Sequence, residues 1–207
     1  MSELPVKSIS YETLTNPTLE FSILSQQIGY VAWSERFTQR TDEDIRRMFT
    51  QDEPALSENA HKSLLRMQDR ARHGVFSGVI ARLRDNPIGS AWATDDRSIS
   101  PQQAELVDDH KPYAWIPHIN VLPETQGHGI GKELLKHVLL PFDADQKPTA
   151  YVFEENQLTL GMFQKLGFVP KPTKPRIKYD YFGEDNEPVE QWRLEAPSVS
   201  AVLKLLK

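Results

Sequence analysis

The residues best suited to chemistry form one glycine-rich segment in the second half of the chain. It reads Gln126-Gly127-His128-Gly129-Ile130-Gly131-Lys132 and follows an apolar stretch that ends at Pro123. The residues after it have the amphipathic spacing of a helix, with Leu134, Leu135, Val138 and Leu139 on one face. A strand that turns into a helix gathers the unpaired N–H groups of the first helical turn around one point, and glycines let a ligand approach the backbone closely. The segment therefore predicts a phosphate or pyrophosphate site.

Two better-known phosphate-binding patterns do not fit this segment. The P-loop of nucleotide-binding proteins needs Gly-Lys followed by Ser or Thr, and the dinucleotide fingerprint needs Gly-x-Gly-x-x-Gly. Here the glycines are spaced Gly-x-Gly-x-Gly. The structural alternative is a tight turn between a strand and a helix that binds no ligand.

The segment resembles the acyl-CoA loop of the GCN5-related N-acetyltransferase (GNAT) superfamily, whose pattern is Gln/Arg-x-x-Gly-x-Gly/Ala. Residues 126–131 match this pattern at every fixed position. A second family motif consists of an Asn, a Tyr seven residues later and then Gly-Phe, and this chain has Asn156, Phe163 and Gly167-Phe168. The two motifs cover roughly residues 113–169, in the order and at the spacing of the family.

The resemblance implies transfer of an acyl group from acetyl-CoA, as co-substrate, to an amine. In this family the strand at 119–121 separates from the next strand, near 149–154, and the pantetheine arm lies in the gap like an added strand. The residues that the resemblance assigns to the cofactor are Ile119, Asn120, Val121, Gln126, Gly127, His128, Gly129, Ile130, Gly131, Lys132, Asn156 and Phe163.

The catalytic groups are less clear, because Phe163 stands where the family often has Tyr. That tyrosine hydroxyl is thought to protonate the leaving thiolate, and phenylalanine has no hydroxyl. Three alternatives are open: Tyr151, Tyr179 or Tyr181 is the acid, water protonates the thiolate, or the domain binds acyl-CoA without turnover. His118 has an unperturbed pKa that suits a general base; a structural histidine with satisfied hydrogen bonds is the alternative.

The neighbours of His118 follow from strand alternation. Alternation places Tyr113, Trp115 and Pro117 on one face of their strand, where the first two are candidates to line the acceptor pocket, and His118 on the other face. The alternative is a bulge in this strand, which is common in the family and would change the face that His118 meets.

Composition excludes several classes of protein. The chain has 207 residues, a net charge of −5, 39% hydrophobic residues and no cysteine. The acidic balance disfavours non-specific nucleic-acid binding, and the lack of cysteine excludes a disulfide scaffold, a thiolate metal site and an acyl-enzyme formed on a thiol. The six histidines lack metal-binding spacing such as His-Glu-x-x-His, so no metal is predicted. No apolar run approaches the ~20 residues of a membrane helix, and no signal peptide is visible; we expect a cytoplasmic protein that does not bind membranes.

The elements that must position these residues alternate between strand and helix signals, which predicts an α/β (α+β) fold. The resemblance implies a mixed, mostly antiparallel sheet that is splayed at its centre and flanked by helices. Within 75–84, Val79 and Ala81 share one face of a strand and Phe76 and Ile80 the other. The expected strands are 5–12, 75–84, 88–94, 113–122, 149–153 and a closing hairpin over 176–182 and 189–195. Three expected helices begin at Asn16-Pro17, at Thr41 and at Ser57, and the third of these ends at Gly74. Three more are expected over 131–140, 157–166 and 198–207.

The resemblance implies one GNAT-like domain over 1–207. In it, helices over 16–73 lie on the acceptor side, 113–169 forms the acyl-CoA-binding core and 197–207 is a C-terminal tail. The expected acceptor is a primary amine of a small molecule or peptide, attacked directly in a ternary complex. The alternatives are a non-catalytic acyl-CoA-binding or sensor module and a transferase for a longer acyl group. The oligomeric state is open, with a homodimer as one option.

Overall fold

The computed structural model describes residues 8–34, 53–95, 113–153, 156–171 and 191–207. These residues form a seven-stranded sheet in the order β1-β2-β3-β4-β5-β7-β6. The strands are β1 (Ile9–Leu14), β2 (Phe76–Leu83), β3 (Asn86–Asp95), β4 (Tyr113–Val121), β5 (Lys147–Phe153), β6 (Val169–Lys171) and β7 (Gln191–Glu195). The helices are α1 (Leu19–Ser34), α3 (Glu53–His73), α5 (Ile130–Leu139), α6 (Gln157–Lys165) and α7 (Val199–Leu205), with a 3-10 turn, η2, at Pro123–Thr125. The predicted mixed, mostly antiparallel α/β architecture is confirmed, and none of the described helices is long and apolar enough to cross a membrane.

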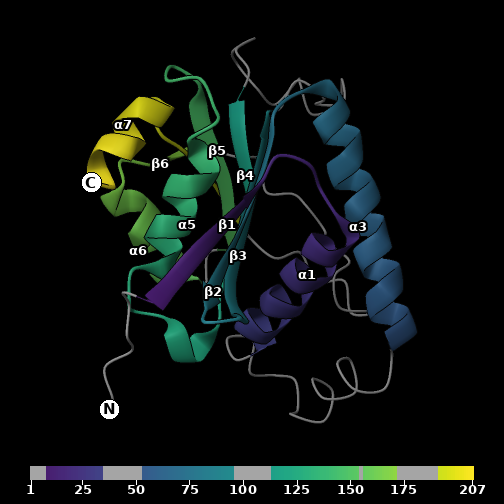
Figure 1. Cartoon of the computed structure of the whole chain (residues 1–207). Coiled ribbons are helices and arrows are strands. Elements are labelled where there is room, and N and C mark those ends of the chain that lie inside the picture. Colours follow the sequence, from purple (N-terminus) through teal and green to yellow (C-terminus); the bar gives the residue numbers. More distant parts are fainter. Residues whose placement is uncertain (1–7, 35–52, 96–112, 154–155, 172–190) are drawn as a thin grey trace.

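Helices cover both faces of the sheet, with α1 and α3 on one face and α5, α6 and α7 on the other (Figure 1). The alternation predicted for β2 explains this arrangement. Val79 and Ala81 belong to the core under α5, whereas Phe76 and Ile80 belong to a smaller core with Phe21 of α1. The predicted apolar face of α5 is also confirmed, because its members are fully buried: Leu134, Leu135, Val138 and Leu139.

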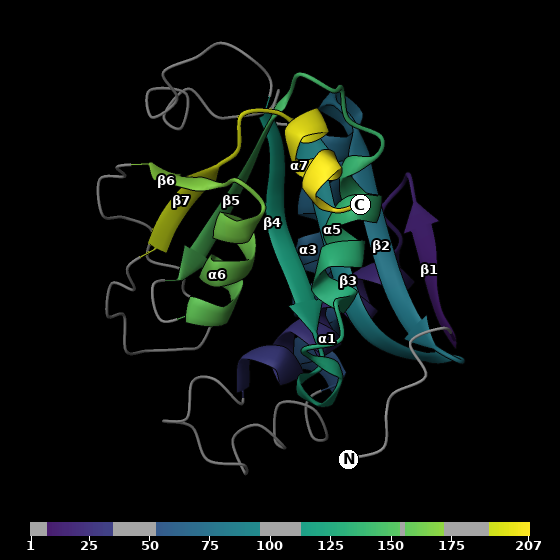
Figure 2. The same cartoon turned by 90° about the vertical axis from the view of Figure 1, so that its left-hand side faces the viewer.

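The sheet opens between β4 and β5. β4 pairs antiparallel with β3 over nearly its whole length, but its parallel pairing with β5 runs only from Tyr113–Lys147 to Ile116–Ala150. Beyond that rung β4 continues to Val121 and β5 to Phe153, and no further pairing joins these two described strands. Figure 2 shows the two strands diverging from this point. The splay expected from the family resemblance is therefore present.

A bulge in β4 changes the face of its side chains. Trp92 pairs with His118 and Thr94 with Trp115, so two steps along β3 match three along β4. The extra residue turns Trp115 toward α1 and α3, the same face as His118. There Trp115 meets the ring of Trp92 edge-on and lies under the guanidinium of Arg70, 3.7 Å from the ring centroid. The expectation that Trp115 and His118 lie on opposite faces is wrong, because the bulge interrupts the alternation.

Several element boundaries differ from the sequence prediction. α1 begins at Leu19, because the Thr18 side chain accepts a hydrogen bond from the Phe21 N–H (3.1 Å) and caps the helix there. α3 begins at Glu53, so Ser57 lies inside the helix and is not its N-cap. β7 lies between β5 and the short β6. The helix expected at Thr41 and the strand at 176–182, with Tyr179 and Tyr181, lie outside the described residues.

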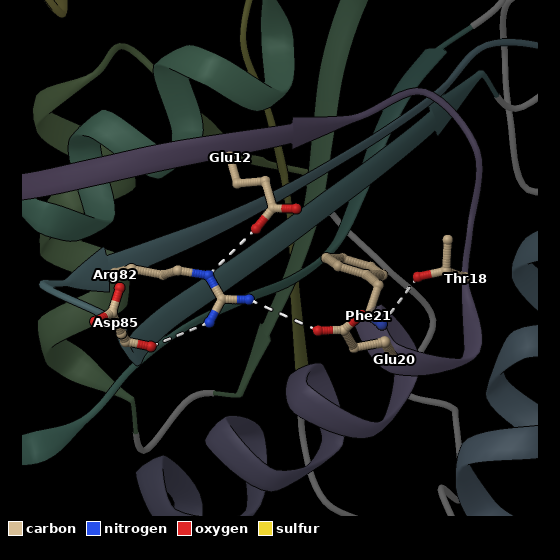
Figure 3. A network of polar contacts seen from close by, with 6 residues as sticks. All are labelled: Glu12, Thr18, Glu20, Phe21, Arg82 and Asp85. Atoms are coloured by element: carbon tan, nitrogen blue, oxygen red, sulfur yellow. Dashed lines mark hydrogen bonds and ion pairs between the residues drawn. The ribbon is translucent and has the colours of Figure 1, made fainter.

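A polar network joins the start of α1 to the β2–β3 hairpin (Figure 3). Arg82 of β2 donates to Glu12 of β1 (Nε–Oε2, 3.2 Å) and to the carbonyl oxygen of Asp85 (Nη1–O, 3.3 Å). Its Nη2 lies 3.9 Å from a carboxylate oxygen of Glu20 on α1. One guanidinium thereby fixes three segments that are distant in sequence, on the face that carries α1.

Candidate functional site

A cleft of about 580 Å³ lies beside the opening of the sheet. Its walls are the end of β4, the loop before α5, the first turn of α5, one face of α6 and Ala32 of α1. All the predicted cofactor residues line this cleft except His128 and Phe163; those that do are Ile119, Asn120, Val121, Gln126, Gly127, Gly129, Ile130, Gly131, Lys132 and Asn156. The structure thus brings together two sequence motifs about thirty residues apart.

Two glycines give the loop its path. Gly127 and Gly129 have φ angles of 81° and 80°, in the left-handed region that favours glycine. A Cβ built on either residue meets no atom within 4 Å, so the backbone angle, and not crowding, selects glycine here. Gly129 is the N-cap of α5, and its carbonyl oxygen accepts from the N–H groups of Lys132 (3.0 Å) and Glu133 (3.1 Å).

The backbone N–H groups of residues 127–131 point to an anion site. In the described part of the chain they have no protein acceptor, whereas the N–H groups just before them, of Thr125 and Gln126, bind the carbonyl oxygens of Leu122 and Pro123. Free N–H groups at the start of a helix, together with a helix dipole worth about half a positive charge, favour an anionic ligand. This geometry supports the phosphate site that the glycine spacing predicted.

Side chains of the loop stabilise it through hydrogen bonds to nearby backbone carbonyl groups. The Gln126 amide donates to the carbonyl oxygen of Val121 (2.9 Å), and the Thr125 hydroxyl donates to that of Leu122 (2.9 Å). His128 turns its Nδ1 back toward the Gln126 carbonyl oxygen (2.9 Å), and its ring is exposed outside the cleft. The side chains of Gln126 and His128 therefore shape the loop.

The opposite wall of the cleft is α6. Asn156 is its N-cap and accepts from the Thr159 N–H (3.2 Å), as expected, while also lining the cleft. Further cleft residues on this helix escaped the sequence analysis: Gln157, Leu158, Thr159, Gly161, Met162 and Lys165. The signal that could have identified them is helical spacing, because positions 158, 162 and 165 share one face once the helix start at Asn156 is fixed.

His118 lies in a polar cluster between β4, β3 and α1. Its Nε2 is 2.9 Å from the Ser25 hydroxyl, 3.1 Å from the Ser90 hydroxyl and 2.9 Å from the Asn120 amide nitrogen. The Asn120 amide nitrogen is a donor and also lies 3.1 Å from Nδ1, so one of the two ring nitrogens accepts from it, which requires a neutral ring. Burial lowers the pKa of His118 to about 4, in agreement with that arrangement. A Cβ on Gly29 would lie 2.7 Å from the Asn120 amide nitrogen, so glycine lets α1 pack against the cluster.

The other candidate catalytic residues lie outside the cleft lining. Phe163 is 2% exposed, and its ring packs edge-on against that of Phe168 at 4.7 Å between centroids. Tyr151, partly buried, lies on β5 just beyond the last rung shared with β4 and pairs with Arg193 of β7. Tyr113, a candidate for the acceptor pocket and not for catalysis, is also outside this lining: it is buried, and the Arg193 guanidinium is 5.5 Å from its ring.

Residues 38–168 match the sequence profile described as the acetyltransferase (GNAT) family. The chain belongs to this family. No curated protein matches the sequence. Among solved structures, the GNAT fold recurs at low identity. The PaiA N-acetyltransferase of Thermoplasma acidophilum, in complex with coenzyme A, is 18% identical with a TM-score of 0.54 and covers 92% of this chain and 99% of its own.

Two further GNAT-like structures extend the comparison. PH1933 of Pyrococcus horikoshii OT3 is 15% identical with a TM-score of 0.56, over 92% of this chain and 98% of its own. Naa50 of Arabidopsis thaliana, in complex with the bisubstrate analogue CoA-Ac-MVNAL, is 16% identical with a TM-score of 0.50, over 91% and 97%. At these identities the likeness shows the shared fold.

Proposed function

We propose that this GNAT chain transfers an acetyl group from acetyl-CoA to a primary amine of a small molecule or peptide, by direct attack in a ternary complex. The observation that carries the proposal is the meeting, in one cleft, of a strand edge left open by the splay and the free N–H groups of residues 127–131. The coenzyme A complex of PaiA and the CoA–peptide analogue complex of Naa50, on the same fold, support it.

Each part of the cleft suits one part of acetyl-CoA. The N–H groups of residues 127–131, with Lys132, hold the diphosphate. The main chain of Ile119 and Val121, on the edge of β4 that faces the opening, pairs with the amides of the pantetheine arm as an added strand would. Asn156 stands on the facing wall. When bound, the co-substrate supplies an acyl group already activated as a thioester.

The described residues offer few groups suited to proton transfer. We therefore attribute most of the proposed rate enhancement to the positioning of the two substrates. His118 is neutral and already accepts hydrogen bonds, and a pKa of about 4 makes it a weak base near neutral pH. Phe163 has no hydroxyl and lies in the core. We therefore assign the removal of the proton from the amine to water. We assign protonation of the leaving thiolate to water or to Tyr151. The rate enhancement then comes from orientation of the reactants and from polarisation of the thioester carbonyl by a backbone N–H. The chain has no cysteine, which excludes an acyl-enzyme on a thiol and favours direct attack.

A thiol-release assay tests the proposal. The purified chain is incubated with acetyl-CoA and a broad panel of primary amines, and free CoA thiol is measured. We expect release that depends on both the protein and one class of amine, with mass spectrometry showing the acetylated amine. Tight acetyl-CoA binding without release for any amine would reject the proposed transfer.

The burial of Phe163 favours a second candidate, a non-catalytic acyl-CoA-binding or sensor module. Such a module needs the cleft but no proton donor to the leaving group. It predicts acyl-CoA binding by calorimetry together with no thiol release above the buffer rate. A transferase for a longer acyl group instead predicts higher affinity and faster release with longer acyl-CoAs than with acetyl-CoA.

A further inference from the structure

We propose that Lys165 of α6 binds the 3′-phosphate of coenzyme A and makes the cleft selective for CoA over dephospho-CoA. The inference rests on the proposed function. It concerns the one phosphate of the ligand that the glycine loop does not account for.

The charges of the cleft are the first observation. The chain as a whole carries a net charge of −5, yet the charged side chains among the described cleft residues are Lys132 and Lys165, both cations. Both are exposed, and within the described residues neither has an acidic partner. Lys136, one turn further along α5, is instead paired with Glu133 at 3.5 Å. The cleft therefore holds unneutralised positive charge in an acidic protein, which favours an anionic ligand.

The position of Lys165 is the second observation. Leu158, Met162 and Lys165 follow one another at helical spacing on the face of α6 that lines the cleft. α6 touches α5 at Met162, whose sulfur would lie 3.4 Å from a Cβ placed on Gly131. Lys165 comes one turn after this contact, about 4.5 Å further along the helix axis. It thus belongs to a different element from the free N–H groups and lies beyond them along the cleft wall.

The chemistry of coenzyme A matches two separate anion sites. Its diphosphate links two parts of the molecule, whereas its 3′-phosphate is a terminal group on the ribose. Free backbone N–H groups suit the first. A lysine suits the second, because its ammonium is a point charge on a flexible stem that can reach a terminal phosphate.

The structural alternative is that Lys165 only complements the helix dipole, because it lies in the last turn of α6. Lys204 has the same place in α7, is exposed, and is not part of the cleft. Lys204→Met is therefore a matched control for the loss of one last-turn lysine and of one positive charge.

The test is calorimetric titration of the full chain with CoA and with dephospho-CoA. We expect Lys165→Met to weaken CoA binding about tenfold, as for one charge-assisted contact, and to change dephospho-CoA binding less than about twofold. Lys204→Met should leave both affinities unchanged, and Lys165→Arg should keep the preference for CoA. Low ionic strength gives the largest difference, because salt screens exposed charges.

The outcomes separate the two proposals. If wild type binds CoA and dephospho-CoA equally, or if Lys165→Met weakens both by the same factor, the assignment of Lys165 is overturned while the cofactor cleft stands. If wild type binds neither ligand, the proposed function itself fails, and this inference with it. The thermal midpoint of each variant shows whether a weaker affinity reflects unfolding.

Discussion

The position of His118, partly buried between β4 and α1, makes the stability of the protein depend on pH in a defined range. Its imidazole accepts a hydrogen bond from the Asn120 amide and has a pKa of about 4 in the folded protein, against about 6.5 in an unfolded chain. Between these two values the unfolded state binds a proton that the folded state excludes. Lowering the pH through this range therefore favours unfolding, whereas above about pH 7 the group has no effect on stability.

The size of the effect follows from the two pKa values. Linkage gives a loss of about 2 kcal/mol from this histidine between about pH 8 and about pH 5. The loss approaches about 3 kcal/mol below pH 4, where both states are protonated. The groups around the ring in the described structure are the hydroxyls of Ser25 and Ser90 and the amide of Asn120. None of them is a carboxylate, so no acidic partner offsets the loss.

The assay compares urea unfolding of wild type and His118→Gln at both pH values. The variant starts less stable at pH 8, by about 1–3 kcal/mol, because the polar groups of Ser25, Ser90 and Asn120 lose the ring as a hydrogen-bond partner. It should then lose about 2 kcal/mol less than wild type on going to pH 5. His73→Gln is the control, because His73 is an exposed histidine on α3, 59% accessible at its side chain, and should show the wild-type loss. Equal pH dependence in wild type and His118→Gln would refute the burial argument.

Three substitutions test other parts of the structure. Gly129→Glu places a carboxylate on the loop at a φ of 80° and should weaken CoA binding more than tenfold in calorimetry; an unchanged affinity would argue against the loop as the phosphate site. Phe163→Tyr adds a hydroxyl to a ring that is 2% exposed; it should cost about 1–3 kcal/mol in urea unfolding without faster thiol release, and an increased rate would show that the ring reaches the thioester. Gly29→Ala puts a Cβ 2.7 Å from the Asn120 amide nitrogen and should destabilise the protein by about 1–3 kcal/mol. Gly161→Ala, with no atom within 4 Å of the new Cβ, should instead stabilise α6 by up to ~1 kcal/mol, and similar effects of the two alanines would contradict the packing of α1.

The features that the sequence predicted are those that local interactions determine. The loop before α5 needs glycine at 127 and 129 because of its own backbone angles. The face of α5 follows from the spacing of four apolar residues, and the cap of α6 from Asn156 three positions before the N–H that it accepts. In each case the deciding partner lies within one or two turns, so a pattern in the sequence suffices.

The features that the sequence missed depend on distant partners. The bulge in β4 exists only relative to β3, since it is a mismatch between two registers. The surroundings of His118 include Ser25, which is 93 residues earlier in the chain. β6 has three residues, too few for alternation to show. Lys165 looks in the sequence like an ordinary last-turn lysine, and only the packing of α6 against α5 places it in the cleft.

Asn120 connects the two halves of the site. Its amide donates to His118, in the cluster that holds α1 against the sheet, and the same residue lines the cofactor cleft. Ala32, also in the lining, comes from α1 itself. A shift of α1 therefore changes both a wall of the cleft and the hydrogen bond that orients Asn120. Because packed cores move between discrete arrangements and do not deform continuously, the helix on the proposed acceptor side and the cofactor cleft must adjust together.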